Sequence, residues 1–409
     1  MQTQLLQALR QTAEGQTAEA ILRKCVHCGF CNATCPTYQL LGDENDGPRG
    51  RIYLIKQLME GTLENAPDSG KRTLEHLDRC LLCRNCETTC PSGVQYSKLL
   101  DIGRHITEQQ VGRPRKEERI RGYLRRYLPD TRLFGLGLSL GRTFKPLLPK
   151  VLASKISKPR AAGQWPAPRH ARKMLILDGC VQPALAPDIN AATARVLDKL
   201  GISLIKAAEA GCCGAISQHL GAPEEAKDYM KRNIDAWWPY LSQGVEAIIT
   251  TASGCGSTVK EYNYHLRGDP EYAIKAERIA HLSKDIAEII SQEDYTRLKP
   301  TKRRKIAWHP PCSLQHGQKI KGVVETILSN SGFELVPVMD EHLCCGSAGT
   351  YSLLQANLAQ QLRTNKLDNL LKHQPEYIVT ANIGCQTFLQ EPSQVPVIHW
   401  IQLLDETIS

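Results

Sequence analysis

Short apolar runs alternate with longer stretches of helical periodicity through the second half of this 409-residue chain. Residues 189–200 and 353–371 are two of the helical stretches. The apolar runs that we interpret as strands are residues 173–177, 202–205, 247–250, 305–308, 333–338 and 377–379. Strands that alternate with helices of this length predict parallel βαβ units.

The earlier part of the chain predicts helices, with residues 49–60 as the best candidate in the first third. Further along the chain, five residues lie at helical spacing: Ile120, Tyr123, Leu124, Tyr127 and Leu128. The longest nearly unbroken apolar stretch, residues 133–140, is far short of the roughly 20 residues that a membrane-spanning helix needs. We therefore expect a protein that is soluble or peripheral to a membrane.

Eight of the sixteen cysteines form two copies of one motif, C-x2-C-x2-C-x3-C-P. The copies begin at Cys25 and Cys80 and are offset by 55 residues at every cysteine. This is the spacing of two-cluster ferredoxins, in which three cysteines of a motif hold one [4Fe–4S] cluster and the fourth holds the other. The predicted ligand sets are Cys25, Cys28, Cys31 and Cys90 for cluster 1, and Cys80, Cys83, Cys86 and Cys35 for cluster 2.

Disulfides and structural zinc are the alternative uses of clustered cysteines. No charged-then-apolar segment opens the sequence, so we expect a reducing compartment, where disulfides are rare. Structural zinc usually takes two separated C-x2-C pairs and does not need three cysteines in register followed by Cys-Pro. The pattern therefore favours iron–sulfur clusters, and His27, inside the first motif, is expected to neighbour a cluster rather than bind it.

The other eight cysteines form a second internal repeat. Cys180, Cys212, Cys213 and Cys255 recur as Cys312, Cys344, Cys345 and Cys385. The offset is 132 residues for the first three and 130 for the last, which indicates a duplicated unit. These cysteines follow predicted strands, and the ligand site of an open parallel sheet lies beyond the carboxyl ends of its strands. We expect them to form a candidate third metal site or to be reduced thiols, with His309 and His316 as core or surface residues.

The formal net charge of +9 is concentrated in one segment. Residues 112–173 carry 17 Lys and Arg against three acidic residues, a local charge of +14. Its prolines predict that the second half is a linker. We interpret the segment as a solvated connector or as a surface for anionic lipid headgroups or an acidic partner. Nucleic acid fits poorly, because no fold signature of that class accompanies the charge.

The cysteine patterns resemble a known family. The Cys…Cys-Cys-Gly…Cys repeat is similar to the cysteine-rich domain of heterodisulfide reductases, anaerobic glycerol-3-phosphate dehydrogenases and glycolate oxidase iron–sulfur subunits. With the two motifs in front, and with residues 47–51 (GPRGR), 251–255 (TASGC) and 380–385 (TANIGC), nearly the whole chain resembles the glycolate oxidase iron–sulfur subunit family. One feature departs from the heterodisulfide reductase pattern, because Thr258 and Phe388 replace the second cysteine of its closing C-x2-C.

The predicted architecture is α+β and α/β: a helical, ferredoxin-like two-[4Fe–4S] domain (1–111), a basic Pro-rich linker (112–172) and a duplicated βαβ cysteine-rich domain (173–300 and 301–409). The resemblance implies an electron-transfer subunit, without catalytic residues of its own, in a glycolate oxidase complex. The sequence has no Gly-rich dinucleotide fingerprint and no P-loop, so we expect FAD in two partner subunits.

Electrons are then expected to reach a membrane acceptor such as quinone, at the cytoplasmic face of the inner membrane. The alternatives are the iron–sulfur subunit of an anaerobic glycerol-3-phosphate dehydrogenase and a catalytic subunit of the heterodisulfide reductase kind.

Overall fold

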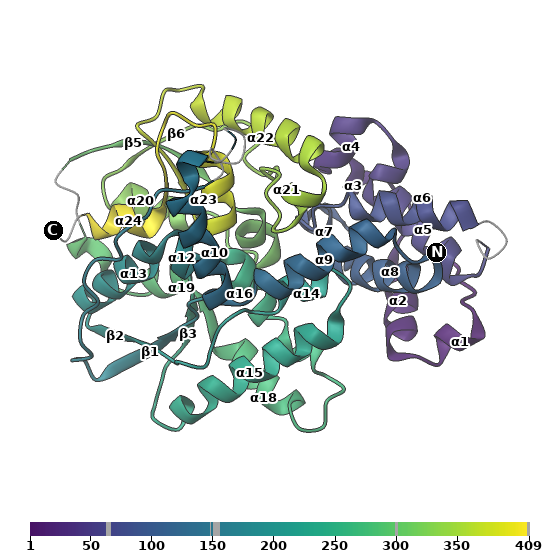
Figure 1. The fold of residues 1–409 in the computed structure, drawn as a ribbon, viewed down its shortest axis with the longest axis horizontal. Coiled ribbons are helices and arrows are strands. Elements are labelled where there is room, and N and C mark those ends of the chain that lie inside the picture. The colour runs from purple at the N-terminus through teal and green to yellow at the C-terminus, as the bar shows by residue number, and fades with distance from the viewer. Residues whose placement is uncertain (63–66, 148, 150–155, 299–301, 407–409) are drawn as a thin grey trace. The chain divides into compact units, whose positions relative to one another are not determined.

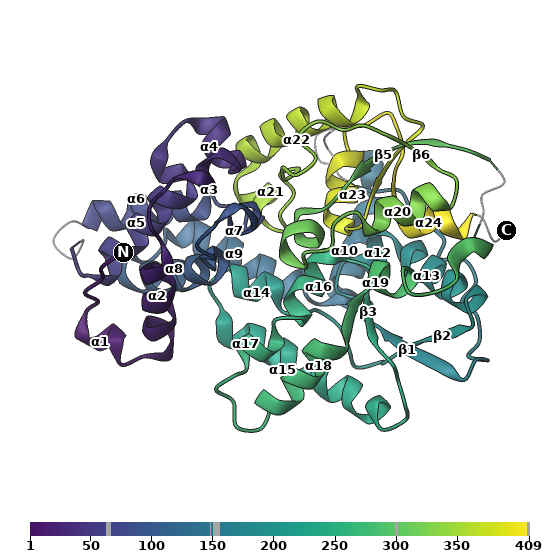
Figure 2. The ribbon, with the colours of Figure 1, turned by 180° about the vertical axis from the view of Figure 1, so that it is seen from behind.

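The computed structural model describes residues 1–62, 67–147, 149, 156–298 and 302–406. The chain forms two compact units, each built from several segments. Unit 1 comprises Met1–Gly122, Gln218–Ala222 and His342–Lys366, and unit 2 comprises Tyr123–Ser217, Pro223–Glu341 and Leu367–Ser409. Figures 1 and 2 show their helices and strands from opposite sides. The bounds of the four predicted segments stay predictions.

The ferredoxin-like part of unit 1 is helical among its described residues. Its core forms where α5, α6 and α2 pack against α8, and Leu22, Ile55, Leu77 and Leu99 are fully buried there. The helices of this part are α1 (Gln7–Arg10), α2 (Ala13–Lys24), α3 (Phe30–Ala33), α4 (Pro36–Leu41), α5 (Pro48–Met59), α6 (Pro67–Asp78), α7 (Asn85–Thr89) and α8 (Tyr96–Val111). The helix predicted over residues 49–60 is thus confirmed, and it begins at Pro48, a residue suited to a first helical position.

Unit 2 contains two four-stranded sheets with the same topology. Their strand orders are β2-β1-β3-β4 and β6-β5-β7-β8, and every pairing is parallel. The first sheet consists of β1 (Arg172–Ile176), β2 (Ile202–Lys206), β3 (Ile248–Thr250) and β4 (Ser283–Asp285). The second consists of β5 (Lys305–His309), β6 (Glu334–Val336), β7 (Tyr377–Thr380) and β8 (Val397–His399). The predicted duplication of a βαβ unit is confirmed.

All six predicted strands form, whereas β4 and β8 were not predicted; β4 (Ser-Lys-Asp) has no apolar residue, and β8 (Val-Ile-His) has only two. Each is followed at once by a short helix that its last residue caps. Asp285 accepts a hydrogen bond from the backbone of Ala287, and His399 accepts one from Ile401. These helices are α19 (Ile286–Ile290) and α24 (Trp400–Asp405). Caps of this kind satisfy the unpaired N–H groups of a helix start.

One hydrophobic core joins the two sheets of unit 2. It contains Ile249 of β3 and Ile306 of β5, together with side chains of α13 (Pro187–Lys199) and α24, which pack against each other. The Ser253 N–H donates to the Ala381 carbonyl oxygen, so the loops after β3 and β7 also meet. The duplicated halves are therefore one folded body. The remaining helices of unit 2 that matter for the sites are α10 (Thr131–Thr143), α12 (Gln182–Leu185), α16 (Ser253–Val259) and α23 (Ile383–Gln390).

None of the thirteen residues of helix α10 is buried. It begins at Asp130, whose carboxylate accepts hydrogen bonds from the backbone of Arg132 and Leu133. Leu136 and Leu140 are 60% and 51% exposed, on one side of the helix. Across the described part of the chain, every helix is too short or too polar to cross a bilayer.

Candidate metal centres

Each C-x2-C-x2-C-x3-C-P motif folds as a turn that precedes one short helix, α3 or α7. In the first turn His27 and Gly29 have φ of +57° and +85°, and in the second Leu82 and Arg84 have φ of +53° and +61°. These left-handed residues are separated by the same 55 positions as the cysteines. The conformation costs a residue with a side chain on the order of 1 kcal/mol or more, so its recurrence indicates that the turn shape serves the cysteines.

Two cavities lie among these cysteines in unit 1. The first is lined by Cys25, Cys28, Cys31 and Cys90, and the second by Cys35, Cys80, Cys83 and Cys86. Cys86 and Tyr96 lie on the walls of both. Each cavity thus includes three cysteines of one motif and the last cysteine of the other, and Cys86 is a fifth cysteine in the wall of the first cavity. These are the two sets predicted from the spacing, while ligation by them stays a prediction.

Burial favours the neutral form of these thiols. It raises the pKa of Cys31 to about 11, and it raises the pKa of Cys25 and, well above the usual range, that of Cys86. The thiolate is the form that binds iron, so metal must displace protons from these sulfurs. Four converging sulfur donors per cavity, with no carboxylate on either wall, fit a [4Fe–4S] cluster.

A fully buried guanidinium, that of Arg51, forms part of the second cavity wall. Its Nε donates to the His76 carbonyl oxygen at 2.7 Å, its Nη1 to Thr37 Oγ1 at 3.2 Å and its Nη2 to Asp46 Oδ1 at 3.4 Å. Asp46, 1% exposed, also accepts from Arg79 at 2.8 Å. A buried charge is tolerated only when it is paired and hydrogen-bonded in this way. The second cavity therefore has a fixed positive charge in its wall.

The four cysteines of the first repeat lie together in unit 2, beyond the carboxyl ends of β1, β2 and β3. The pKa of Cys212 is raised well above its usual range by hydrogen bonds with the side chains of Cys180 and Cys213, and by burial. The pKa of Cys255, on α16, is raised by a hydrogen bond with Cys213 and by burial. The predicted convergence at a sheet edge is thus observed for this repeat.

Backbone clamps hold the Cys-Cys pair of the first repeat in place. Asn233 Nδ2 donates to the Cys212 carbonyl oxygen at 2.8 Å, and the Tyr262 hydroxyl donates to that of Cys213 at 3.0 Å. Gly214 follows with φ of +92°, and a Cβ there would lie 2.8 Å from the Ala226 carbonyl oxygen. Only glycine fits this position, which explains the third letter of the Cys-Cys-Gly pattern.

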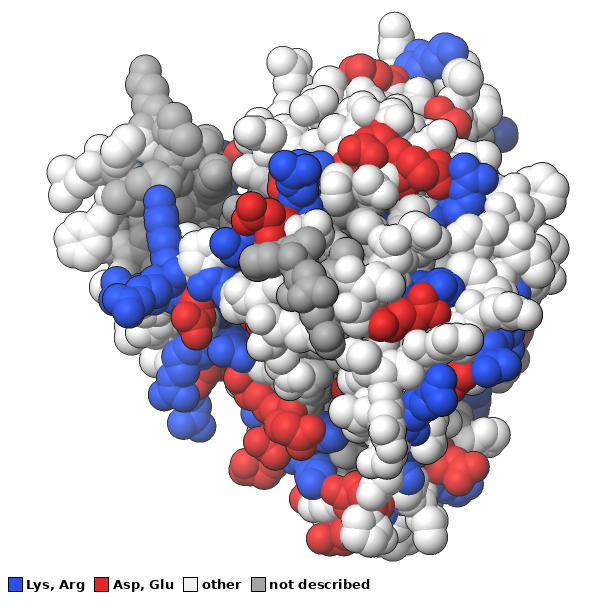
Figure 3. Space-filling view, turned by 90° about the vertical axis from the view of Figure 1, so that its right-hand side faces the viewer, with Lys and Arg blue, Asp and Glu red and all other residues white. Residues whose placement is uncertain are grey.

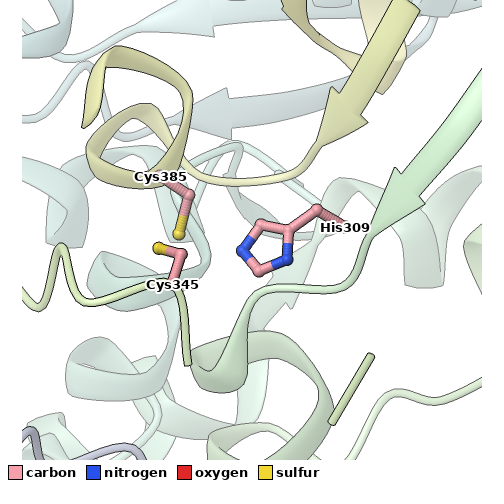
Figure 4. A group of neighbouring side chains, drawn as sticks. All are labelled: His309, Cys345 and Cys385. Carbon is pink, nitrogen blue, oxygen red and sulfur yellow. The ribbon is translucent and has the colours of Figure 1, made fainter. Parts of the chain in front are cut away.

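The cysteines of the second repeat are divided between the two units. Cys312 follows β5 and Cys385 lies on α23, both in unit 2, whereas Cys344 and Cys345 belong to the segment His342–Lys366 of unit 1. Figure 4 draws His309, Cys385 and Cys345, and shows the His309 ring on the side of the Cys385 sulfur. A ring nitrogen of His309 and Cys385 Sγ lie within 4.8 Å of each other.

Several residues of these sites were not predicted as such. His309 was expected to be a core or surface residue; it is buried, as expected of a core residue, but close to a cysteine. Tyr96 and Arg51 line the cysteine cavities; Arg51 ends the GPRGR run of the sequence, but nothing in that run shows that its side chain is buried, and Tyr96 has no motif signal. A single arginine in an amphipathic helix is usually solvated, and only the packing of α5 against α6 and α8 buries this one.

Comparison with known proteins agrees with this arrangement. A "4Fe-4S dicluster domain" matches residues 21–94, and a "Cysteine-rich domain" matches residues 174–260 and 306–390. The chain is 52% identical over its full length to the glycolate oxidase iron-sulfur subunit of Escherichia coli, of which it covers 99%. It is 29% identical, over 90% of its length and 88% of the relative, to a probable glycolate oxidase iron-sulfur subunit of Bacillus subtilis.

The chain belongs to the glycolate oxidase iron–sulfur subunit family. A crystal structure of a hypothetical protein from Helicobacter pylori has the same fold, with a TM-score of 0.53 and 11% identity over 97% of this chain and 73% of that one. The helical unit with two cysteine motifs and the duplicated parallel sheets are thus features of this family member's fold.

Part of the basic segment of this family member is held in ion pairs within the fold. Arg113 and Arg121 both pair with Asp78 in unit 1, at 2.6 and 2.9 Å. In unit 2, Arg169 pairs with Asp198 and Arg172 pairs with Glu246. On the face drawn in Figure 3, basic and acidic side chains are interspersed. The uneven charge of the sequence therefore does not translate into an equal excess of free positive charge at the surface.

The Arg51 network predicts a large stability difference between two arginine substitutions. Arg51→Met removes three hydrogen bonds and leaves Asp46 buried with one cation fewer, so we expect the free energy of unfolding to fall by about 2–4 kcal/mol. Arg23→Met breaks an exposed pair with Glu19 on α2 and should cost no more than about 0.5 kcal/mol. Urea denaturation of the two iron-loaded variants measures both values, and equal losses would contradict the assigned role of Arg51.

Proposed function

We propose that this chain is the electron-relay subunit of a complex that oxidises glycolate. The observation that carries the proposal is the pair of four-cysteine cavities that share Cys86 and Tyr96 in their walls. Family membership supports a role in electron transfer, and the relative from E. coli is named for glycolate. Oxidation of a 2-hydroxy acid removes two electrons with a hydride, which is flavin chemistry, so FAD belongs to partner subunits.

In this proposal the two motifs hold one cluster each and exchange their last ligands. Cys25, Cys28, Cys31 and Cys90 hold cluster 1, and Cys80, Cys83, Cys86 and Cys35 hold cluster 2. Such clusters accept and release one electron at a time. The chain contributes four sulfurs per site, most of them buried or partly buried, and keeps the two sites adjacent. Arg51 places a buried positive charge beside cluster 2, and Arg49 places a partly exposed one beside cluster 1, and both favour the reduced, more negative state of the neighbouring cluster.

The cysteines of the first repeat are a candidate third metal site, because their four thiols already contact one another in the order Cys180, Cys212, Cys213 and Cys255. Their counterparts Cys312, Cys344, Cys345 and Cys385 are candidates on the basis of the repeat alone. We propose the two ferredoxin-type sites as the relay, and the relay does not depend on a third.

A peripheral contact with the membrane is the second part of the proposal. The exposed apolar residues Leu136, Leu140 and Phe144 are spaced by four along α10 and the residue after it, so they lie on one side. Arg132 at the start of the same helix is exposed. An apolar stripe with basic residues beside it is typical of helices that lie at a membrane surface. We propose that the complex rests on the cytoplasmic face of the inner membrane and delivers electrons to quinone.

Loss of one cluster ligand separates the relay from substrate oxidation. Cys83→Ser should abolish reduction of quinone analogues by the assembled complex while glycolate still reduces the flavin, because the lesion lies after hydride removal. Thr89→Ala, on the adjacent helix α7, is the matched control and should retain both activities. Stopped-flow absorbance of flavin and quinone measures the two steps. Loss of flavin reduction in a fully assembled Cys83→Ser complex would show that this chain shapes the substrate site instead.

If each motif gives its last cysteine to the cluster of the other motif, variants of cysteines that hold the same cluster should change the same paramagnetic signal. Cys35→Ala should perturb the same paramagnetic signal as Cys80→Ala, since both cysteines line the second cavity. Cys90→Ala and Cys25→Ala should perturb the other signal, since both line the first. Electron paramagnetic resonance of the dithionite-reduced variants reports this directly. If Cys35→Ala and Cys25→Ala affect one common signal, each motif holds its own cluster.

If α10 contacts the membrane, loss of basic residues at or beside it and loss of its apolar residues should weaken membrane retention in two different ways. Arg132→Gln, combined with Arg126→Gln at an exposed residue of the preceding helix Arg115–Tyr127, should shift release to lower salt, because attraction to anionic lipid is screened within about 8 Å at physiological ionic strength. Leu136→Ser with Leu140→Ser should weaken retention at every salt concentration. Ile274→Ser, at an apolar residue that is 80% exposed elsewhere in unit 2, is the control. Sedimentation of membranes after salt washes measures retention, and unchanged retention of both double variants would rule out α10 as the contact.

A further inference from the structure

A cavity of about 300 Å³ opens in unit 2 at the carboxyl ends of β1 and β2. This volume is at the lower end of the range of small-molecule sites, about 300–1,000 Å³. Its polar lining consists of Asp178, Gln182, Asn190 and Lys206, and most of the rest is apolar, with Trp165 as the largest side chain. Its place in the fold, beyond the ends of parallel strands, is where ligands of open α/β sheets bind.

A chain of hydrogen bonds sets the orientation of the two amides in this wall. Asp178 pairs with Lys206, and its Oδ1 accepts from Asn190 Nδ2 at 2.9 Å, so the oxygen of Asn190 faces the other way. That oxygen accepts from Gln182 Nε2 and from Thr251 Oγ1, both at 2.7 Å. Gln182 Nε2 is therefore held against Asn190 and Thr251, to both of which it donates. Reversal of either amide would place two donors or two acceptors against each other.

The consequence is an oxygen atom, Gln182 Oε1, that has no hydrogen-bond partner although the residue is only 3% exposed. A buried acceptor left in this state costs about 1–3 kcal/mol. Gln182 lines the cavity, so a ligand that donates a hydroxyl or N–H hydrogen there would recover this cost. The geometry thus points to a ligand with a donor at this wall.

The other groups define the rest of the ligand. Lys206 Nζ lies 2.8 Å from Asp178 Oδ2 and 4.4 Å from the centre of the Trp165 ring, and it retains N–H donors for a ligand oxygen. The indole N–H of Trp165 donates to the Leu204 carbonyl oxygen at 3.2 Å, which holds the ring in place. The Lys206–Asp178 pair is neutral in sum, so the cavity suits a neutral molecule rather than a phosphate or a carboxylate.

The polar groups belong to the first repeat alone. At the offset of 132 residues that relates the cysteines, Gln182 corresponds to Leu314, Asn190 to Gly322 and Lys206 to Val338. These polar side chains are therefore not needed to build the repeated fold, since the second sheet forms without them. They are specific to this cavity.

The cavity also adjoins both the thiol site and the exposed apolar helix of unit 2. Cys180 stands between Asp178 and Gln182 in the same loop. Helix α12, which begins with Gln182, is held to α10 because Arg142 Nη2 donates to the Ala184 carbonyl oxygen at 3.3 Å. If α10 rests on a membrane, as proposed above, a ligand that enters the cavity from the lipid would need to be apolar and neutral. The headgroup of a quinone meets each of these requirements: it is flat and neutral, with an oxygen at each end that is a donor in the reduced form.

We propose that this cavity binds the headgroup of a quinone, with one oxygen at Gln182 and the other at Lys206. The inference rests on the proposed function, in which quinone accepts the electrons. It adds the place of binding in unit 2 and the residues that recognise the headgroup.

The test measures binding of a short-chain quinone in its reduced form, whose hydroxyl can donate to Gln182 Oε1, to the purified, iron-loaded protein by anaerobic calorimetry. Gln182→Leu and Lys206→Met should each raise Kd about tenfold, through loss of one polar contact. Ala162→Leu, which fills the cavity from a partly exposed position, should raise Kd further without touching the core. Lys199→Met, an exposed position of α13 outside the cavity, should leave Kd unchanged.

The outcomes separate this inference from the relay. If glycolate reduces the clusters of the assembled complex while Gln182→Leu and Ala162→Leu bind the quinone as tightly as the unaltered protein, the cavity is not the quinone site. If glycolate fails to reduce the clusters at all, the relay proposal fails, whatever the Kd values. Weaker binding by Ala162→Leu with unchanged iron content supports the cavity even if Gln182→Leu does not fold.

Discussion

The convergence of buried thiols is the constraint on which this structure depends. Four sulfurs converge on each cavity, and burial raises the pKa of Cys25, Cys31 and Cys86, so a metal must displace the protons of these three thiols. A short chain segment can aim three sulfurs at one point only through a sharp turn, and the left-handed residues at His27 and Leu82 make that turn. The fourth sulfur comes from the other motif. The two motifs therefore have to pack against each other for either cavity to be complete.

The charge of a bound cluster also has to be compensated by groups around each cavity. A cluster bound by four thiolates is anionic, and a buried anion needs a compensating group. Arg51 supplies one for the second cavity, and its own burial is made tolerable by Asp46, Thr37 and a carbonyl oxygen. Among the basic residues between 112 and 173, Arg113 and Arg121 share the largely buried Asp78, whereas the ion pairs of Arg125, Arg160, Arg169 and Arg172 are partly exposed. Position, rather than number, decides what a charge does here.

Unit 2 contains two copies of one parallel sheet, and the copies differ in the residues at their strand ends. Both sheets have the same strand order and both Cys-Cys-Gly turns need glycine at positive φ, at Gly214 and Gly346. The first copy alone has the hydrogen-bonded chain Asp178, Asn190 and Gln182 at its strand ends. The second copy has His309 close to Cys385 instead. The same fold thus presents two chemically different sheet edges.

The sequence by itself determined the two cysteine sets, the six longer strands and the duplicated architecture. Ligand spacing and apolar periodicity are local properties, so they survive without knowledge of the fold. The tertiary structure alone decided that Arg51 is buried, that Gln182 Oε1 is left without a partner and that the segment His342–Lys366 belongs to unit 1. Each of these depends on contacts between residues far apart in the chain, such as Arg51 with His76 and Gln182 with Thr251. Contacts of that kind leave no period in a sequence, because they arise only when helices and strands pack.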